Sequence, residues 1–430
     1  MVVTRISGLL EKITVFVVFC CCCLPAQAKY GGGSGTSDDP YLIYNAGQMN
    51  AIGADSNDWD RHFKLMADVN LAAFTGTQYN IIGYYVSSSD NKPFKGTFDG
   101  NGYAVLNFNF TSTGLCFVGL FGYVDDPNAE IEDLGLIDPN IDVDGAWRIG
   151  PLVGWLSTGT ITNCWVDGGR FSGVDGVGGL VGRNAGTITD CSSSASVSGA
   201  FGIGGLVGIN DGKITGCYSS GDVCGFSSVG GLVGFNGGTI SNCYSDVNVS
   251  EIQVMGGLVG QNEGTITNCY SGGDVSGCMV NGGLVGANSG TITNCYAATS
   301  VSGTHDLGGL VGQHNGGTIS NCYSIGSVDG EGRLGGLVGS GSPDYVLNSF
   351  WDIESSGQAS SVGGKGKKTA EMQMQFTFTD AGWDFIKLWD IGENQTYPYL
   401  RTGPASDINK DGITNFLDFA VIAQKWMQGK

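Results

Sequence analysis

Residues 256–269 read Gly-Gly-Leu-Val-Gly-Gln-Asn-Glu-Gly-Thr-Ile-Thr-Asn-Cys, and close variants of this stretch recur along the middle of the chain. Gly-Gly-Leu-Val-Gly occurs seven times, and a Gly-Pro-Leu-Val-Gly variant stands upstream of the first copy. The closing glycines are Gly154 of the variant and then Gly182, Gly208, Gly234, Gly260, Gly286, Gly312 and Gly339. Their nearly constant spacing is typical of a repeat architecture.

Each repeat holds three short runs of β-prone residues, namely Leu-Val, Thr-Ile-Thr and a segment ending in Val-Ser, separated by Gly or Asn. None of these runs is long enough for a helix, and glycine is unfavourable inside one. Three strands and three turns in about 26 residues form one rung of a parallel β-solenoid, which buries its apolar face only by stacking on other rungs. The sequence therefore predicts an all-β solenoid of about eight rungs, about 40 Å long.

The repeat also predicts which side chains face inward. These are the Leu and Val of Gly-Gly-Leu-Val-Gly, the Ile of Thr-Ile-Thr, and the Cys at the end of Thr-Ile-Thr-Asn-Cys. Because Ile and Cys break the alternation of a strand, we expect a bend at the Asn between them, with left-handed backbone and hydrogen bonds to its copies. The bend residues are Asn163, Asn242, Asn268, Asn294 and Asn321. A second repeated Asn is expected in a similar turn, at Asn184, Asn210, Asn236, Asn262, Asn288 and Asn315.

The repeat cysteines allow two interpretations. Ten cysteines follow Ala28, and disulfides are common in exported proteins. Seven of the ten occupy equivalent repeat positions, which stacking places about one strand spacing apart, slightly beyond disulfide geometry. They are Cys164, Cys191, Cys217, Cys243, Cys269, Cys295 and Cys322. We therefore favour a buried ladder of free thiols over disulfides.

These Gly-Leu-Val-Gly copies with their trailing Thr-Ile-Thr-Asn-Cys-Tyr resemble the GLUG-motif repeats of secreted and surface proteins of bacteria. The resemblance covers about residues 116–343. It implies a solenoid used in adhesion or surface architecture, and some relatives attach the repeat to a peptidase. The chain contains no His-Glu-x-x-His motif and only three histidines, so the sequence gives no sign of a metallopeptidase.

The ends of the chain indicate export. Residues 1–28 carry Arg5 and Lys12, an apolar run from Ile13 to Leu24 and a small-residue cleavage site, so we expect a signal peptide cleaved near Ala28. No later segment is apolar for long enough to span a bilayer, and the expected location is secreted or cell-surface. With 40 acidic against 20 basic residues the net charge is −20, which disfavours nucleic acid as a partner.

Two less regular regions flank the repeats. Residues 29–115 are expected to form an N-terminal β cap, and residues 344–402, rich in aromatic residues, a C-terminal cap. Trp351, Trp383 and Trp389 allow a second interpretation, in which this cap is a platform for carbohydrate. The expected partners are therefore a surface protein or a polysaccharide.

The last segment, residues 403–430, carries the strongest short motif. The motif Asp-Ile-Asn-Lys-Asp-Gly-Ile-Thr-Asn-Phe-Leu-Asp has the oxygen spacing of a calcium loop, including a glycine at position six. The expected Ca²⁺ ligands are Asp407, Asn409, Asp411, the backbone carbonyl of Ile413, Asn415 and Asp418. The segment resembles one calcium repeat of a type I dockerin, which implies a cohesin-like partner. The chain departs from that family because it has one repeat and carries Phe416 and Leu417 at positions that are often polar.

Three functions fit the sequence. The first is a non-catalytic adhesive or structural solenoid with a calcium-ordered docking tail. The second is a polysaccharide lyase or glycoside hydrolase, since β-solenoids host such enzymes. The acidic residues between positions 150 and 340 are scattered over turns, whereas such an enzyme needs clustered carboxylates, and we therefore favour the first. The third is a glycan-binding module.

Overall fold

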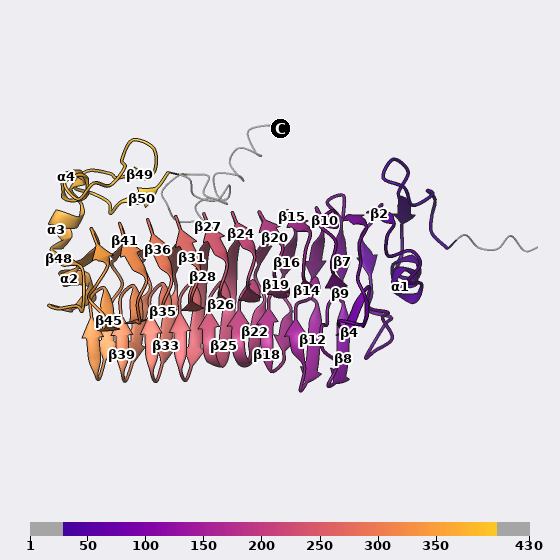
Figure 1. Cartoon of the computed structure of the whole chain (residues 1–430), viewed down its shortest axis with the longest axis horizontal. Coiled ribbons are helices and arrows are strands. Elements are labelled where there is room, and N and C mark those ends of the chain that lie inside the picture. The colour runs from indigo at the N-terminus through magenta and orange to yellow at the C-terminus, as the bar shows by residue number, and fades with distance from the viewer. Residues whose placement is uncertain (1–28, 402–430) are drawn as a thin grey trace, which may run out of the picture.

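Residues 29–401 are described by the computed structural model, and they form a long rod of stacked β-strands (Figure 1). One side of the rod is a sheet of twelve parallel strands. In spatial order they are β1 (Tyr41–Ile43), β2 (His62–Leu65), β6 (Thr97–Asp99), β10 (Glu130–Glu132), β15 (Thr160–Thr162), β20 (Thr187–Thr189), β24 (Lys213–Thr215), β27 (Thr239–Ser241), β31 (Thr265–Thr267), β36 (Thr291–Thr293), β41 (Thr318–Ser320) and β46 (Val346–Leu347).

A second side is a nine-stranded sheet. Its strands are β9 (Phe121–Val124), β14 (Val153–Leu156), β19 (Val181–Asn184), β23 (Val207–Asn210), β26 (Val233–Asn236), β30 (Val259–Asn262), β35 (Val285–Asn288), β40 (Val311–His314) and β45 (Val338–Gly341). The remaining strands of each turn belong to a 25-stranded sheet. In one rung these are β32 (Tyr270–Gly272), β33 (Asp274–Gly277) and β34 (Val280–Gly282).

The solenoid class is as expected, but the number of turns is not. The twelve-stranded sheet marks about twelve turns rather than eight, because the stacking continues into the segments expected to be caps. Its first turns pair His62, Thr97, Glu130, Thr160 and Thr187 in succession, and the length of chain between neighbours shortens at each step. The early turns therefore share the register of the later ones while their unequal lengths hide the repeat in the sequence.

Close backbone approach explains the glycines of Gly-Gly-Leu-Val-Gly. A Cβ on Gly204 would lie 2.1 Å from the Val207 carbonyl oxygen, and one on Gly205 would lie 2.1 Å from the Gly231 carbonyl oxygen of the next rung. A Cβ on Gly208 would lie 2.5 Å from the carbonyl carbon of Gly176. All three glycines of the motif thus stand where backbones touch, and a side chain would force them apart.

The core positions are those that the repeat predicts. Leu, Val, Ile and Cys of each regular rung are at most 1% exposed, as Leu206, Val207, Ile214 and Cys217 illustrate. The seven repeat cysteines are all free and buried. Each backbone N–H in the series from Cys164 to Cys295 donates to the sulfur of the next cysteine at 3.3–3.4 Å. Burial raises the pKa of the Cys217 thiol, which favours the neutral form.

The bend asparagines also lie as expected. Asn163, Asn242, Asn268, Asn294 and Asn321 have φ between 50° and 55°. The amide of Asn268 donates to Asn242 at 3.1 Å, and that of Asn294 donates to Asn268 at 3.3 Å. The left-handed backbone thus turns the chain while the side chains connect successive rungs.

The second set of asparagines differs from the expectation. Asn184, Asn210, Asn236, Asn262 and Asn288 are fully buried at strand ends, and their amides form a ladder with N–O distances of 2.7–2.8 Å. His314, and not Asn315, aligns with Asn288 and continues the ladder. These residues therefore satisfy one another inside the rod, because a buried amide needs partners.

The C-terminal region packs against the side of the rod. Tyr218, Tyr244, Tyr270, Tyr296 and Tyr323 stack with ring centroids 4.9–5.1 Å apart. The last four lie in one apolar cluster with residues that follow β47 (Phe350–Asp352). That segment contains α2 (Ile353–Ser356), β48 (Lys365–Lys367), α3 (Thr369–Met372), α4 (Gln375–Thr379), β49 (Trp389–Asp390) and β50 (Tyr399–Leu400) (Figure 1).

Both ends of the rod have covered edges. The backbone of Gly31 and Gly32 pairs with Leu42 in the first strand of the twelve-stranded sheet. At the other end the Val362 N–H donates to the Val338 carbonyl at 3.1 Å, and the Val338 N–H donates to the Ser361 hydroxyl at 2.8 Å. The first edge of the twelve-stranded sheet and the last edge of the nine-stranded sheet are thus protected against the addition of further strands.

Candidate binding groove around Trp59

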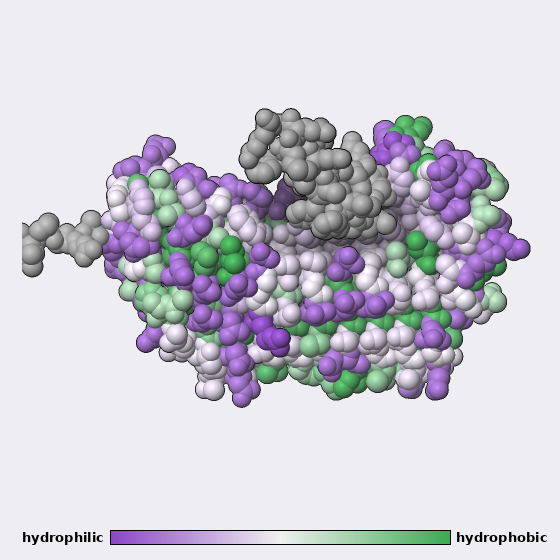
Figure 2. Space-filling view, turned by 180° about the vertical axis from the view of Figure 1, so that it is seen from behind, coloured by the Kyte–Doolittle hydropathy of each residue, from purple (hydrophilic) through white to green (hydrophobic). Residues whose placement is uncertain are grey.

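On the twelve-stranded sheet the regular rungs present columns of like residues. In the twelve-stranded sheet the outward positions from β15 to β41 are Thr or Ser, with Lys213 as the exception. In the view of Figure 2, rows of similar hydropathy run along the repeat region, whereas the N-terminal end is a patchwork. This face therefore offers no site built from different side chains.

The N-terminal end offers such a site around Trp59. The helix α1 (Ala46–Ala54) begins where the Asn45 side chain accepts from the Gln48 N–H at 3.0 Å. Trp59 lies in the loop after it and is only 5% exposed. Its indole N–H donates to the Ile52 carbonyl at 2.8 Å, and its carbonyl accepts the Lys95 N–H at 2.7 Å. Trp59 is thus held in place by one hydrogen bond from its side chain and one to its backbone.

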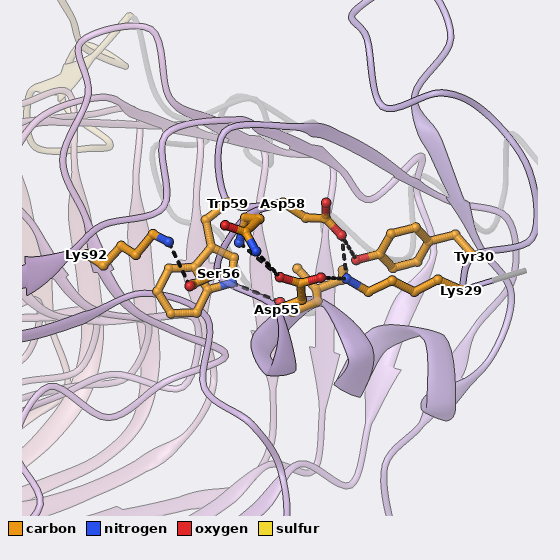
Figure 3. Close-up of polar contacts among 9 residues, drawn as sticks. Lys29, Tyr30, Asp55, Ser56, Asp58, Trp59 and Lys92 are labelled. Carbon is orange, nitrogen blue, oxygen red and sulfur yellow. Dashed lines mark hydrogen bonds and ion pairs between the residues drawn. The ribbon is translucent and has the colours of Figure 1, made fainter.

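A polar network fixes the same loop to the start of the described chain (Figure 3). The Lys29 ammonium donates to Asp55 at 2.8 Å and to Asp58 at 2.5 Å, and the Tyr30 hydroxyl donates to Asp58 at 2.8 Å. The hydrogen bond from Lys29 lowers the pKa of Asp55. Burial and the bond to Asp58 raise the pKa of Tyr30. These hydrogen bonds and ion pairs therefore hold the loop in place at pH values above the range in which carboxyl groups titrate.

Two adjoining hollows flank Trp59, and together they form what we call the Trp59 groove. One, of about 450 Å³, is lined by Asp60, Asn91, Lys92, Lys95 and Asp125, together with the shared Ser56 and Trp59. The other, of about 430 Å³, contains Tyr84, Asn80 and Leu115 beside the same two shared residues. Both volumes lie in the range of ordinary ligand sites.

A hairpin inserted between turns supplies one wall of the groove. It consists of β4 (Tyr84–Ser87) and β5 (Asp90–Lys92). The Lys92 ammonium donates to the Ser56 hydroxyl at 2.7 Å and lies 6.0 Å from the Trp59 ring centroid. Tyr84 is 43% exposed and stands edge-on to Trp59 with centroids 6.0 Å apart. The groove thus combines an open aromatic ring with fixed charged and polar groups.

Sequence reasoning did not find this groove. Its residues are spread over Gly53 to Asp125, and no motif connects them. The one available signal was Lys92 and Lys95, two basic residues close together in a strongly acidic chain.

The residues expected to bind calcium lie outside the described residues, as does the expected signal peptide at 1–28. Within residues 29–401 no three His, Cys, Asp or Glu side chains gather where they could hold a metal ion. Over the same range no helix is long and apolar enough to cross a membrane.

The alternative interpretation of Trp351, Trp383 and Trp389 as a platform for carbohydrate does not fit their burial. Trp351 is 6% exposed, Trp383 is 4% and Trp389 is 0%. Trp383 and Trp389 pack on each other and on Tyr323 with centroid distances of 4.7–6.2 Å. Their rings are buried in the apolar contact with the rod. They therefore have no open face, which a ring needs in order to stack on a sugar.

The motif resemblance is confirmed for the regular rungs. Five segments match the GLUG motif, namely residues 173–198, 199–223, 227–250, 253–276 and 303–329. The rod is therefore a parallel β-solenoid that carries GLUG motif repeats between residues 173 and 329.

Two relatives match part of the chain. Over 166 residues, or 38% of the chain, it is 32% identical to "Halomucin" of Haloquadratum walsbyi and spans 2% of that protein. In an alignment of 213 positions that covers 41% of the chain, it is 33% identical to "Putative Gly-rich membrane protein" of Evansella cellulosilytica and spans 24% of that protein. The chain thus corresponds to a minor part of either relative.

One solved structure resembles the rod at low identity. The crystal structure of "a putative immunoglobulin A1 protease from Bacteroides ovatus" is 22% identical, with 87% of this chain and 96% of that chain covered and a TM-score of 0.41. A similarity at this level carries no argument about activity.

Proposed function

We propose that this protein is exported and acts without catalysis at the cell surface or outside the cell, as an adhesive or structural rod. The observation that carries the proposal is the repetition of one face of the rod, on which the outward side chains of the twelve-stranded sheet from β15 to β41 are Thr or Ser at every position except Lys213. Repeated identical contacts suit multivalent attachment, whereas catalysis needs one constellation of different groups. Relatives named "Halomucin" and "Putative Gly-rich membrane protein" are consistent with a surface location.

The location is tested on intact producing cells. Protease added to whole cells should degrade the protein, or the protein should be found in the medium, while a cytoplasmic marker stays intact. Protection on intact cells and degradation only after lysis would overturn the proposed location. A second assay incubates the protein with a panel of polysaccharides and measures new reducing ends and unsaturated products. Release of either from any member would contradict the non-catalytic role.

The proposed docking element is the calcium loop near the C-terminus. Asp407, Asn409, Asp411, Asn415 and Asp418 supply oxygen atoms at the spacing that Ca²⁺ prefers. When bound, the ion would neutralise these carboxylates and order the segment for a surface partner. A cohesin-like protein is the partner that the dockerin resemblance implies.

Calorimetric titration with CaCl₂ tests this element. The double variant Asp407→Ala and Asp411→Ala loses two of the proposed ligands and should lose the heat of binding. The matched variant Asp274→Ala, an exposed acid of the rod, should keep it. Equal affinities in the two variants would remove the loop from consideration.

A further inference from the structure

From the Trp59 groove we infer a binding site for a neutral oligosaccharide at the N-terminal end of the rod. The site is distinct from the repeated faces and from the calcium loop, and it does not depend on the proposed location. It is concave, it occurs at one place in the described chain, and its walls carry an exposed ring beside convergent polar groups.

The polar groups of the groove match hydroxyl groups. Lys92 and Lys95 offer ammonium donors, and in the described part of the chain neither forms an ion pair. Asp60 offers an acceptor, and its ion pair with Arg61 is exposed on both sides at 3.2 Å, which makes that pair weak. Donors and acceptors thus face the same space, and a sugar hydroxyl can both donate and accept.

The aromatic part of the groove provides a stacking surface. Tyr84 is 43% exposed, and its edge-on contact with Trp59 fixes the orientation of the Tyr84 ring. Leu115, which is also 43% exposed, lines the same hollow. An open ring with an adjacent apolar side chain can cover the C–H face of a pyranose while the polar wall binds its hydroxyls.

The charge of the chain decides between neutral and acidic sugars. Asp60 and Asp125 share a hollow with Lys92 and Lys95, so the lining carries no excess of positive charge. The whole chain has a net charge of −20, and its field repels a polyanion. A neutral oligosaccharide avoids this repulsion, and its binding should change little with salt because no counterions are exchanged.

Calorimetric titration of the whole protein tests the inference. The probes are hexasaccharides of glucose, xylose, mannose and N-acetylglucosamine, with hexagalacturonate as the acidic probe. We expect at least one neutral hexasaccharide to bind, with an affinity that is equal within twofold at low and high salt. Tyr84→Ala should weaken that binding at least tenfold, because it removes the stacking ring.

Matched variants separate the groove from the rest of the surface. Lys92→Met keeps the length of the side chain and removes its donors, so we expect a loss of about fivefold or more. Tyr345→Ala removes a tyrosine that is 66% exposed, in a hollow beside β46 at the other end of the rod, and Lys213→Met removes an exposed lysine of β24. Both should bind as the unaltered protein does. Melting curves confirm that each variant is folded, and Tyr84→Leu replaces Tyr84→Ala if the latter is not.

Three results would overturn the inference. They are an absence of binding to every neutral probe, equal affinity in the Tyr84, Lys92 and Tyr345 variants, and preferential binding of hexagalacturonate that salt abolishes. None of them bears on whether the protein is found at the cell surface, so a failure here is distinct from a failure of the proposed function.

Discussion

The first turns of the rod and the regular rungs share one register and differ in almost everything else. In the inward column of the twelve-stranded sheet, Phe63 and Phe98 stack directly before Ile131 and Ile161. The outward positions change from Lys64, which forms an ion pair with Asp99 at 2.6 Å, to rows of Thr.

The difference shows what repetition allows and what it excludes. Equal rungs let identical residues satisfy one another, as the buried asparagines do at 2.7–2.8 Å. Unequal turns leave room for α1, for the hairpin of β4 and β5, and for a groove lined by unlike side chains. The regular rungs therefore suit architecture, and the irregular turns suit selective binding.

The largest expected effect is on a glycine of the regular rungs. Gly208→Ala places a Cβ 2.5 Å from the Gly176 carbonyl carbon and 2.7 Å from the Gly182 carbonyl oxygen. Because these neighbours are backbone atoms, we expect a loss of about 4 kcal/mol or more in the free energy of unfolding. Urea unfolding followed by circular dichroism measures it. Gly76→Ala, at φ +61° with no atom within 4 Å of the added Cβ, should cost about 1 kcal/mol, and similar losses would refute the backbone-contact explanation.

The buried amide ladder should be nearly as sensitive. Asn236→Ala removes the acceptor of Asn210 and the donor to Asn262, both at 2.7 Å. Two buried amide groups then lose a partner, at a cost of about 2–4 kcal/mol. Asn109→Ala in the irregular turns removes one partly exposed bond to the Asn107 carbonyl and should cost less than about 1 kcal/mol. The same denaturation experiment compares the two, and equal costs would show that the ladder contributes no special stability.

A smaller effect, on the pH dependence of stability, is expected at His314, the last residue of that ladder. Burial lowers the pKa of His314 below its usual value, so the unfolded state takes up its proton first as the pH falls. The stability linked to this group is therefore present above about pH 6.5 and is lost as the pH falls below it. His314→Asn extends the asparagine series and should remove this part of the pH dependence. Unfolding free energies at about pH 5 and pH 7 test it, and an unchanged difference between wild type and variant would contradict the assignment.

The smallest perturbation is chemical labelling of the folded protein. Cys278 is exposed, and Cys116 and Cys224 are half-buried, so a maleimide should modify Cys278 first and these two later. The seven ladder cysteines are buried and should react only on unfolding, because the thiolate is the reactive form. Peptide mapping by mass spectrometry identifies each site. Rapid modification of Cys243 in the native protein, or its recovery in a disulfide, would rule out the thiol ladder.

The groove and the turn count mark the limits of sequence reasoning. Thr-Ile-Thr-Asn-Cys predicted the inward Ile and Cys and the left-handed Asn, because each lies within one repeat. The sequence predicted that the second asparagine series lies in turns and that Asn315 is its last member. In the structure this last position is taken by His314. The sequence also left open whether Trp383 and Trp389 are a platform, since burial depends on a segment that returns to the side of the rod.

The sequence by itself determined the solenoid class, the length of a rung and the core positions of the regular repeats. These properties follow from spacing, and spacing is a local feature that recurs in every repeat. Only the tertiary structure decided that the stacking continues to about twelve turns and that Trp59, Tyr84 and Lys92 meet at one groove. The reason is physical, because parallel pairing and packing join residues that are far apart in the chain and impose no fixed spacing between them.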